Sequence, residues 1–373
     1  MEKQQKQGNQ VDAQKLDPNM AVEESRDDGL KWLSPKEEPF RLSGFAWFAK
    51  ERIYRRLPLH PQHPIRPEVD RLADATAGGQ IAFRTNSLRL SLRVTLGGKA
   101  NMNHMPATGQ CSFDCYLGEP GNQQYYSTGR YDHALLAYET ALYQFPERTM
   151  RHVTLNFPLY QKVEEVWIGV DADAELLPPL PYASGKKVVV YGTSITQGGC
   201  ASRPGMAYTN ILSRRFPLEF VNLGFSGNGK GEPEVARIIS EIEQPALFVL
   251  DYEANIGGDR EAMRRTLPEF IRILRERHPA VPILVVSKIR YARELFEPRL
   301  KQMRLDLKQV EIETVESFRR QGDLNVHFFD GEALLGENFN ECSVDGVHPT
   351  DLGFLRMADG LTPIIAKLLA GEI

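Results

Sequence analysis

KVVVYGTSITQG (187–198) is an apolar run that ends in a glycine and passes directly into small polar residues. Runs without alternation of apolar and polar residues are typical of strands buried on both faces of a parallel sheet. Four more runs of this kind follow along the chain: EFVNLG (219–224), ALFVLD (246–251), PILVVS (282–287) and VHFFD (326–330). The second half of the chain therefore predicts a five-stranded parallel sheet.

Helical patterns separate these runs. One segment carries apolar residues at i, i+3, i+4 and i+7: Val235, Ile238, Ile239 and Ile242. Residues 263–274 repeat such a face, and residues 296–320 form a longer amphipathic pattern. Alternating strands and helices indicate an α/β domain with helices on both faces of a parallel sheet.

The first half of the chain has a different period. In LRLSLRVTL (88–96) apolar and polar residues alternate, which marks a strand with one buried face. VTLNFPLY (153–160) and VEEVWIGV (163–170) are further short strands, with glycine, proline and asparagine turn signals around them. Many short strands with frequent turns favour an all-β sandwich, of jelly-roll type, over an α/β domain.

Two stretches set the expected domain boundaries. LLPPLPYASG (176–185) has four prolines in ten residues and is interpreted as a linker. The first 28 residues are charged and contain no aromatic residue, so they bury too little apolar surface to offset their ordering entropy. We expect a mobile N-terminal segment at 1–28, a β-sandwich domain at 29–178 and the α/β domain at 179–373.

Composition excludes several classes of protein. The 373 residues carry 45 Lys and Arg against 49 Asp and Glu, a formal net charge of −4. A nucleic-acid-binding protein would instead be expected to have a strongly basic domain. No apolar run reaches 18 residues, and MEKQQKQGNQ (1–10) lacks the apolar core of a secretory signal. Four cysteines are too few for a disulfide scaffold. We expect a cytoplasmic protein with no membrane or nucleic-acid partner, and a homo-oligomer is left open.

Polar residues follow the predicted strands where a ligand is expected. In open α/β sheets ligands bind at the carboxyl ends of the strands. The stretches to inspect are therefore 192–198, 222–228, 251–255 and the late loop 345–349.

Two of these stretches contain a potential nucleophile and base. Ser194 follows the first strand, where it serves either as a helix cap or, with a base beside it, as a nucleophile. His348 is the one histidine of eight that follows an aspartate, Asp345, by three residues in a loop with glycine and proline. Such a loop lets the carboxylate hold the imidazole while the other ring nitrogen faces Ser194. On its own, Asp-x-x-His is equally compatible with a surface loop.

Taken together, four blocks in order carry a resemblance. Gly192-Thr-Ser194-Ile-Thr, Gly224-Phe-Ser-Gly227-Asn, Asn255 and Asp345-x-x-His348-Pro resemble the blocks of the SGNH hydrolases, the GDSL esterase/lipase superfamily. The resemblance covers residues 186–370 and implies a flavodoxin-like three-layer α/β/α domain. It also implies an esterase that needs no metal or cofactor.

The resemblance assigns roles to individual residues. It makes Ser194 the nucleophile, His348 the base and Asp345 the residue that orients the base. The backbone N–H of Gly227 and the side-chain amide of Asn255 join the Ser194 N–H in an oxyanion hole.

The sequence departs from the family pattern at several positions. The first block has Thr193 and Ile195 where the family has Asp and Leu, and the third block lacks the glycine directly before Asn255. The sandwich resembles the N-terminal module with a Gly-x-Asp-Leu-Tyr signature, which appears here as Ser112-Phe-Asp-Cys-Tyr116.

Other kinds of site fit less well. An α/β-hydrolase elbow needs glycine at position 196, which is Thr. Gly224-Phe-Ser-Gly-Asn-Gly-Lys230 matches a P-loop, but Gly231 stands where a hydroxyl should ligate Mg²⁺. Cys111 and Cys115 lack the second pair that a zinc site requires. Cys200 and Cys342 lie near Ser194 and Asp345, but no other signal supports a cysteine nucleophile.

The expected function is hydrolysis of short-chain acyl esters. The loops TQGGCASRPG (196–205), FSGNGKGEPE (225–234) and EANIGGDR (253–260) are small and polar, which suits acetyl groups better than long acyl chains. SGNH enzymes with a sandwich domain in front resemble carbohydrate acetylesterases more than lipases, so the resemblance implies that the small-molecule ester is an acetylated saccharide. The alternatives are a catalytically vestigial carbohydrate-binding protein and, behind it, a P-loop-type nucleotide-binding protein.

Overall fold

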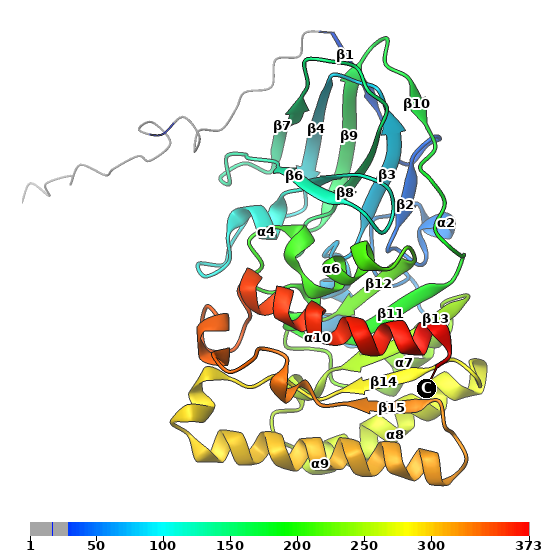
Figure 1. Cartoon of the computed structure of the whole chain (residues 1–373), viewed down its shortest axis with the longest axis vertical. Coiled ribbons are helices and arrows are strands. Elements are labelled where there is room, and N and C mark those ends of the chain that lie inside the picture. Colours follow the sequence, from blue (N-terminus) through cyan, green and yellow to red (C-terminus); the bar gives the residue numbers. More distant parts are fainter. Residues whose placement is uncertain (1–16, 18–28, 373) are drawn as a thin grey trace, which may run out of the picture.

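The computed structural model describes residue 17 and residues 29–372, so the predicted mobile segment 1–28 lies almost wholly outside the described residues. The first module is a sandwich of two antiparallel sheets, at the top of Figure 1. One sheet consists, in spatial order, of β1 (Leu30–Leu33), β9 (Val163–Asp171), β4 (Arg89–Leu96) and β7 (Ala137–Gln144). The other consists of β10 (Leu176–Leu177), β3 (Gln80–Thr85), β8 (Arg151–Asn156), β5 (Asp114–Leu117) and β6 (Gln124–Thr128), with β2 (Arg41–Ser43) also paired to β3.

The alternation in β4 orients its apolar side chains into the sandwich core, as expected. Leu90, Leu92, Val94 and Leu96 are all buried, and they share that core with residues of the facing sheet such as Phe83. The stretch 176–185, interpreted as a linker, begins with two residues that belong to the sandwich, inside the expected domain boundary at 178. Leu176 and Leu177 pair with Thr85 and Arg84 of β3, which extends the sandwich sheet by one short strand.

The second module is built on a parallel sheet, as the uninterrupted apolar runs predict. Its strands, in spatial order, are β12 (Glu219–Gly224), β11 (Lys187–Gly192), β13 (Pro245–Asp251), β14 (Ile283–Val286) and β15 (Val326–Phe329). All four neighbouring pairs are parallel. The order 2-1-3-4-5 is that of flavodoxin-like folds, which confirms the expected fold class.

Helices cover both faces of this sheet. α6 (Tyr208–Arg215) and α10 (Asp351–Ala370) share a core with Val188 and Val190 of β11. On the opposite face, Val189 and Tyr191 share a core with three helices: α7 (Pro233–Ser240), α8 (Arg260–Arg277) and α9 (Pro298–Arg320). Side chains of successive strand residues point to opposite faces, so this one strand contributes to both cores. None of the helices in the described part of the chain is long and apolar enough to cross a bilayer.

The two modules are interlocked. The segment between β2 and β3 leaves the sandwich, forms α2 (Phe48–Glu51) and α3 (Pro67–Ala73), and buries Leu57 and Val69 in the core of α7 and α8. Arg56 is fully buried and donates hydrogen bonds to the carbonyls of Ala75, Leu72 and Gly224. Gly224 ends β12, so a side chain from the first module holds a strand end of the second.

A second junction is made by the Ser112–Tyr116 stretch of the sandwich, which directly follows the short helix α4 (Ala107–Cys111). Asp114 is fully buried and accepts hydrogen bonds from the Gly205 N–H at 2.7 Å and from Arg203 at 3.0 Å. Arg203 also donates to the Tyr116 hydroxyl at 2.5 Å. The aspartate and tyrosine of this signature therefore clamp the loop that leads from β11 to α6.

Candidate active site

Ser194 lies at the carboxyl end of β11, where α5 (Ser194–Gln197) begins. The helix cap is Thr193, whose hydroxyl accepts from the Ile195 N–H at 3.3 Å. Since the neighbouring residue supplies the cap, the Ser194 hydroxyl is available for another partner. Ser194 Oγ lies 2.8 Å from Nε2 of His348, although the two residues are 154 positions apart.

The loop that carries His348 also orients its ring. His348 Nδ1 lies 2.7 Å from Oδ2 of Asp345, and Oδ1 of the same carboxylate accepts from the backbone N–H groups of Val347 and His348. Partial burial favours a higher pKa for Asp345, but these hydrogen bonds outweigh it and lower the pKa below its ordinary value. An ionised Asp345 fixes the tautomer with the proton on Nδ1, which leaves Nε2 free to accept from Ser194.

Gly227 and Asn255 follow the two strands that flank β11. Gly192 is in register with Gly224 on one side and with Asp251 on the other, so the three strand ends are level. Gly227 lies in the loop after β12 with φ +67°, a conformation that favours glycine, and space is open around its Cα. Asn255 lies in the 3-10 helix η3 (Glu253–Ile256), which follows β13.

The Asn255 amide connects these two loops. In its favourable orientation Oδ1 accepts from the N–H groups of Asn228 and Gly229, each at 3.1 Å. The opposite orientation places Nδ2 against those same donors and gains one long bond, to the Phe225 carbonyl at 3.3 Å. We adopt the first orientation, in which both Nδ2 protons remain for a ligand.

Asp251, at the end of β13, is hydrogen-bonded to side chains of the neighbouring helices. Its Oδ2 accepts from the hydroxyls of Tyr208 at 2.9 Å and Thr196 at 3.3 Å. Burial raises the pKa of Asp251 to about 7 despite these bonds. An acidic residue used this way braces α5 and α6 against the sheet, which is not the Mg²⁺-binding arrangement that the P-loop interpretation needs.

The sandwich module contributes residues that the sequence did not indicate. The Tyr160 hydroxyl lies 3.4 Å from the Ser194 carbonyl and 3.5 Å from Ser226 Oγ, and burial raises the pKa of Tyr160. His104 comes from the loop before α4, and its Nε2 lies 3.8 Å from Oδ2 of Asp345. No local pattern marks either residue, because their positions depend on how the two modules pack.

A cavity adjoins the triad at this junction. Its volume is about 580 Å³, and its lining combines residues of both modules: Asn103, His104, Met105, Cys200, Ser202 and Val344. Part of the lining is fixed by Asp351, which accepts from the Ser202 N–H at 2.8 Å. The cavity therefore offers hydrogen-bonding groups as well as apolar surface within reach of His348.

The four cysteines are free and buried. Burial, with the nearby Asp345 charge second, raises the pKa of Cys200 to about 12, so this thiol is protonated at neutral pH and is a poor nucleophile. Cys342 accepts a hydrogen bond from Arg356 at 3.0 Å, away from the Ser194 hydroxyl. Cys111 and Cys115 belong to the sandwich core.

The three-layer fold and the Ser194–His348–Asp345 contacts together define a hydrolase of the SGNH type. The model of the GDSL-like lipase/acylhydrolase family matches residues 185–366, and the model of the N-terminus of SGNH-hydrolase-type esterases, GxDLY, matches residues 30–176. The chain belongs to the GDSL-like lipase/acylhydrolase family and is an esterase.

Solved structures resemble the chain over nearly its whole length. A protein from Bacteroides ovatus described as a GDSL-like lipase is 31% identical, with a TM-score of 0.84 over 92% of this chain and 98% of its own. The salicylyl-acyltransferase of a tetracycline biosynthetic pathway is 21% identical, with a TM-score of 0.73 over the same shares. A family two carbohydrate esterase from Cellvibrio japonicus is 14% identical, with a TM-score of 0.60 over the same shares. The last two show the fold alone, and no curated protein matches the chain.

Proposed function

We propose that this esterase removes short acyl groups, acetyl above all, from a carbohydrate, with Ser194 as its nucleophile. The observation that carries the proposal is the hydrogen-bonded series from Ser194 Oγ to His348 Nε2 at 2.8 Å and from His348 Nδ1 to Asp345 Oδ2 at 2.7 Å. A serine hydroxyl becomes nucleophilic when a base takes its proton, and a third group must orient that base.

The reaction follows from these contacts. Ser194 Oγ attacks the ester carbonyl carbon as its proton passes to His348 Nε2, and Asp345 stabilises the imidazolium that forms. His348 then gives this proton to the leaving alcohol oxygen, which leaves the acyl group on Ser194. A water molecule, deprotonated by His348, then attacks the acyl-enzyme. The bond between the acyl carbon and Ser194 Oγ breaks as His348 returns this proton to Oγ, and the acid is released.

Backbone and amide donors support an oxyanion hole at the same edge. Within the described residues, the N–H groups of Ser194 and Gly227 are bound to no acceptor, and both follow strand ends that are level. The Asn255 amide adds Nδ2, because its oxygen is occupied by the loop of Gly227. Donors fixed before the reaction stabilise the charge that develops on the carbonyl oxygen.

The substrate class rests on the loops and the cavity. The loops after β11, β12 and β13 are small and polar, and no apolar cluster among them would hold a long acyl chain. The cavity of about 580 Å³ presents amide, imidazole and hydroxyl groups, which suit the hydroxyls of a sugar. Family two carbohydrate esterases are among the structural neighbours, one of them in complex with cellohexaose.

A hydrolysis panel tests the proposal. We compare kcat/KM for p-nitrophenyl acetate, butyrate and octanoate, and we measure acetate release from an acetylated xylo-oligosaccharide. We expect the acetyl ester to be preferred and acetate to be released, with Ser194→Ala as the background control. Preference for octanoyl, or no acetate from any acetylated sugar, contradicts the substrate class. Rates equal to those of Ser194→Ala on every ester would instead favour a vestigial carbohydrate-binding protein.

A further inference from the structure

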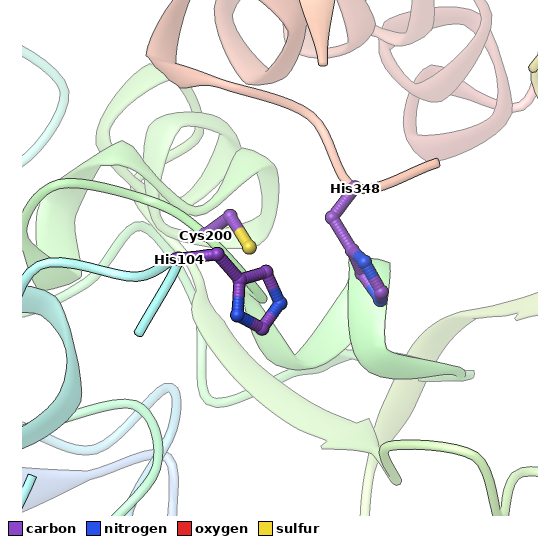
Figure 2. A group of neighbouring side chains, drawn as sticks. All are labelled: His104, Cys200 and His348. Carbon is purple, nitrogen blue, oxygen red and sulfur yellow. The ribbon is translucent and has the colours of Figure 1, made fainter. Parts of the chain in front are cut away.

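Three side chains with metal-binding atoms, one of them the histidine of the triad, lie close together (Figure 2). His104 comes from the sandwich module, Cys200 from the loop after α5, and His348 from the loop before α10. One potential ligand atom of each lies within 4.8 Å of the other two. The segments that bring them together are separated by about 100 residues or more in the sequence, so the cluster is a product of the tertiary fold.

The donor set is that of a zinc site. Zn²⁺ binds histidine nitrogen at about 2.0–2.1 Å and cysteine sulfur at about 2.3 Å in tetrahedral geometry, which places ligand atoms roughly 3.3–3.8 Å apart. The observed separations need to close by about 1 Å to reach that geometry. His104 has the freedom to do so, because 37% of its side chain is exposed.

His348 is already oriented as a zinc ligand. In metal sites a ligating histidine commonly donates its other ring N–H to a carboxylate, which fixes the ring. Here Nδ1 is bound to Asp345 at 2.7 Å, so a metal would take Nε2 and displace the Ser194 hydroxyl that lies 2.8 Å from it. The Cδ2 atom next to Nε2 lies close to the backbone of Gly199, the residue before Cys200, and would be 3.3 Å from a Cβ placed there.

Charge and access also favour a cation at this place. His104 Nε2 lies 3.8 Å from the Asp345 carboxylate, which keeps negative charge beside the cluster. His104 and Cys200 both line the cavity of about 580 Å³ at the module junction, which supplies an entry path and room for a water as fourth ligand. Cys200 itself has a φ of +76°, unusual for a residue other than glycine, and this backbone conformation sets the direction of its thiol.

We propose that His104, Cys200 and His348 bind a divalent transition metal of the Zn²⁺ class, and that the bound metal reversibly inhibits the esterase. Binding forms bonds from the metal to two neutral imidazoles and to the Cys200 sulfur, and the thiol proton is released to solvent. Nε2 of His348 then holds the metal and cannot accept the Ser194 proton. The inhibition rests on the proposed function of Ser194 and His348, whereas the binding itself does not.

The test uses the full-length protein after chelator treatment, with Co²⁺ as a spectroscopic probe and Zn²⁺ as the inhibitor. We expect Co²⁺ to give a thiolate-to-cobalt charge-transfer band that Cys200→Ser loses and Ser194→Ala keeps. Loss of a ligand should cost at least the roughly 10–100-fold in metal affinity that losing a supporting partner costs. The measured quantity is the Zn²⁺ concentration that halves the rate, with each variant normalised to its own rate without Zn²⁺. His104→Ala should raise this concentration about tenfold or more.

A matched control separates this site from general metal binding. His133 is an exposed histidine of the sandwich module, and His133→Ala should be inhibited by Zn²⁺ as strongly as the wild type. The proposal is overturned if Co²⁺ gives no thiolate band with the wild type, or if His104→Ala and His133→Ala respond alike. If no ester is hydrolysed at all, the proposed function fails, while the Co²⁺ spectra still decide the metal site.

Discussion

Two carboxylates at this edge of the sheet, Asp345 of the triad and Asp251, have opposite environments. Asp345 is partly exposed, receives three hydrogen bonds from the backbone and ring of its own loop, and has a lowered pKa. Asp251 is enclosed by β11, α5 and α6, receives two hydroxyl hydrogen bonds, and has its pKa raised by burial to about 7. An aspartate is therefore held ionised in the loop before α10 and pushed toward its neutral form at the end of β13.

The difference shows what assigns a role to an acidic residue at this edge. A carboxylate stabilises an imidazolium only when it stays ionised and touches the ring, and Asp345 alone of the two meets both conditions. Asp251 ties two helices to the sheet, a use in which a neutral carboxyl serves as well. Position at a strand end alone does not make an acidic residue part of the reaction.

The largest expected effect on kcat comes from removing the nucleophile or the base. Ser194→Ala and His348→Ala should each lower kcat by a factor on the order of 10⁶, as loss of the nucleophile or base does in serine proteases. The measurement is kcat for p-nitrophenyl acetate, with circular dichroism to show that the variants are folded. Labelling of the wild type by a fluorophosphonate should map to Ser194, and labelling at Ser226 or Cys200 would refute the assignment.

The comparison itself predicts a large difference between two matched variants. Asp345→Asn should lower kcat by a factor of about 10⁴, because the amide no longer fixes the imidazole tautomer. Asp251→Asn should lower kcat less than the roughly tenfold that 1.4 kcal/mol of barrier represents. Equal losses in the two variants would break the comparison, and a silent Asp345→Asn would mean that the backbone orients His348.

A smaller effect is expected at the oxyanion hole. Loss of one such donor typically lowers kcat by a factor of about 10²–10³, and Asn255→Ala should fall in this range with KM little changed. Steady-state kinetics on p-nitrophenyl acetate measure both constants. A rate within about twofold of the wild type would remove Asn255 from the site and leave it only its bonds to Asn228 and Gly229.

The smallest effect concerns stability and pH. Folded Asp251 keeps its proton up to about pH 7, whereas the unfolded chain releases it near the ordinary pKa of 3.8. The stability that this raised pKa contributes is thus present below about pH 4 and is lost as the pH rises to 7. For one proton the slope is at most about 1.4 kcal/mol per pH unit. Buried Glu253, with its pKa also raised to about 7 by burial, acts in the same direction.

Urea unfolding at pH 5 and pH 7 measures this slope. Asp251→Asn should flatten the loss of stability between these two values, since it removes one of the groups that cause it. Asp345→Asn is the control. Because the pKa of Asp345 is lowered, its contribution to the free energy of unfolding is present at both pH 5 and pH 7 and is lost only as the pH falls below about 4. A slope unchanged by Asp251→Asn would contradict the raised pKa.

Much of the fold and the four blocks could be predicted from the sequence. Uninterrupted apolar runs require a sheet buried on both faces, and parallel strands bring their carboxyl ends to one edge, so Ser194 and the blocks after β12 and β13 were expected together. The Asp-x-x-His spacing is a local property of one loop, and it correctly indicated the contact between Asp345 and His348.

Features that depend on packing between the modules could not be predicted. The sequence offers Ser194 either as the cap of α5 or as the partner of a base. Thr193 caps the helix and Ser194 contacts His348, which is 154 residues away in the chain. His104 and Tyr160 belong to the sandwich by sequence, and no periodicity shows that they reach the triad. The pKa of Asp251 likewise depends on enclosure by helices that are distant in the chain.

The buried Arg56 has a consequence for how the chain acquires its structure. Its partner Gly224 lies 168 residues further on, so the contact belongs to the non-local kind that slows folding. During synthesis from the N-terminus, the segment from Gly44 to Gly79 has no strand end to bind until β12 has left the ribosome. Leu57 and Val69 of this segment, which pack in the core of the second module, stay uncovered for that interval, and such exposure is a hazard for aggregation. A chain interrupted before residue 224 would carry this liability permanently.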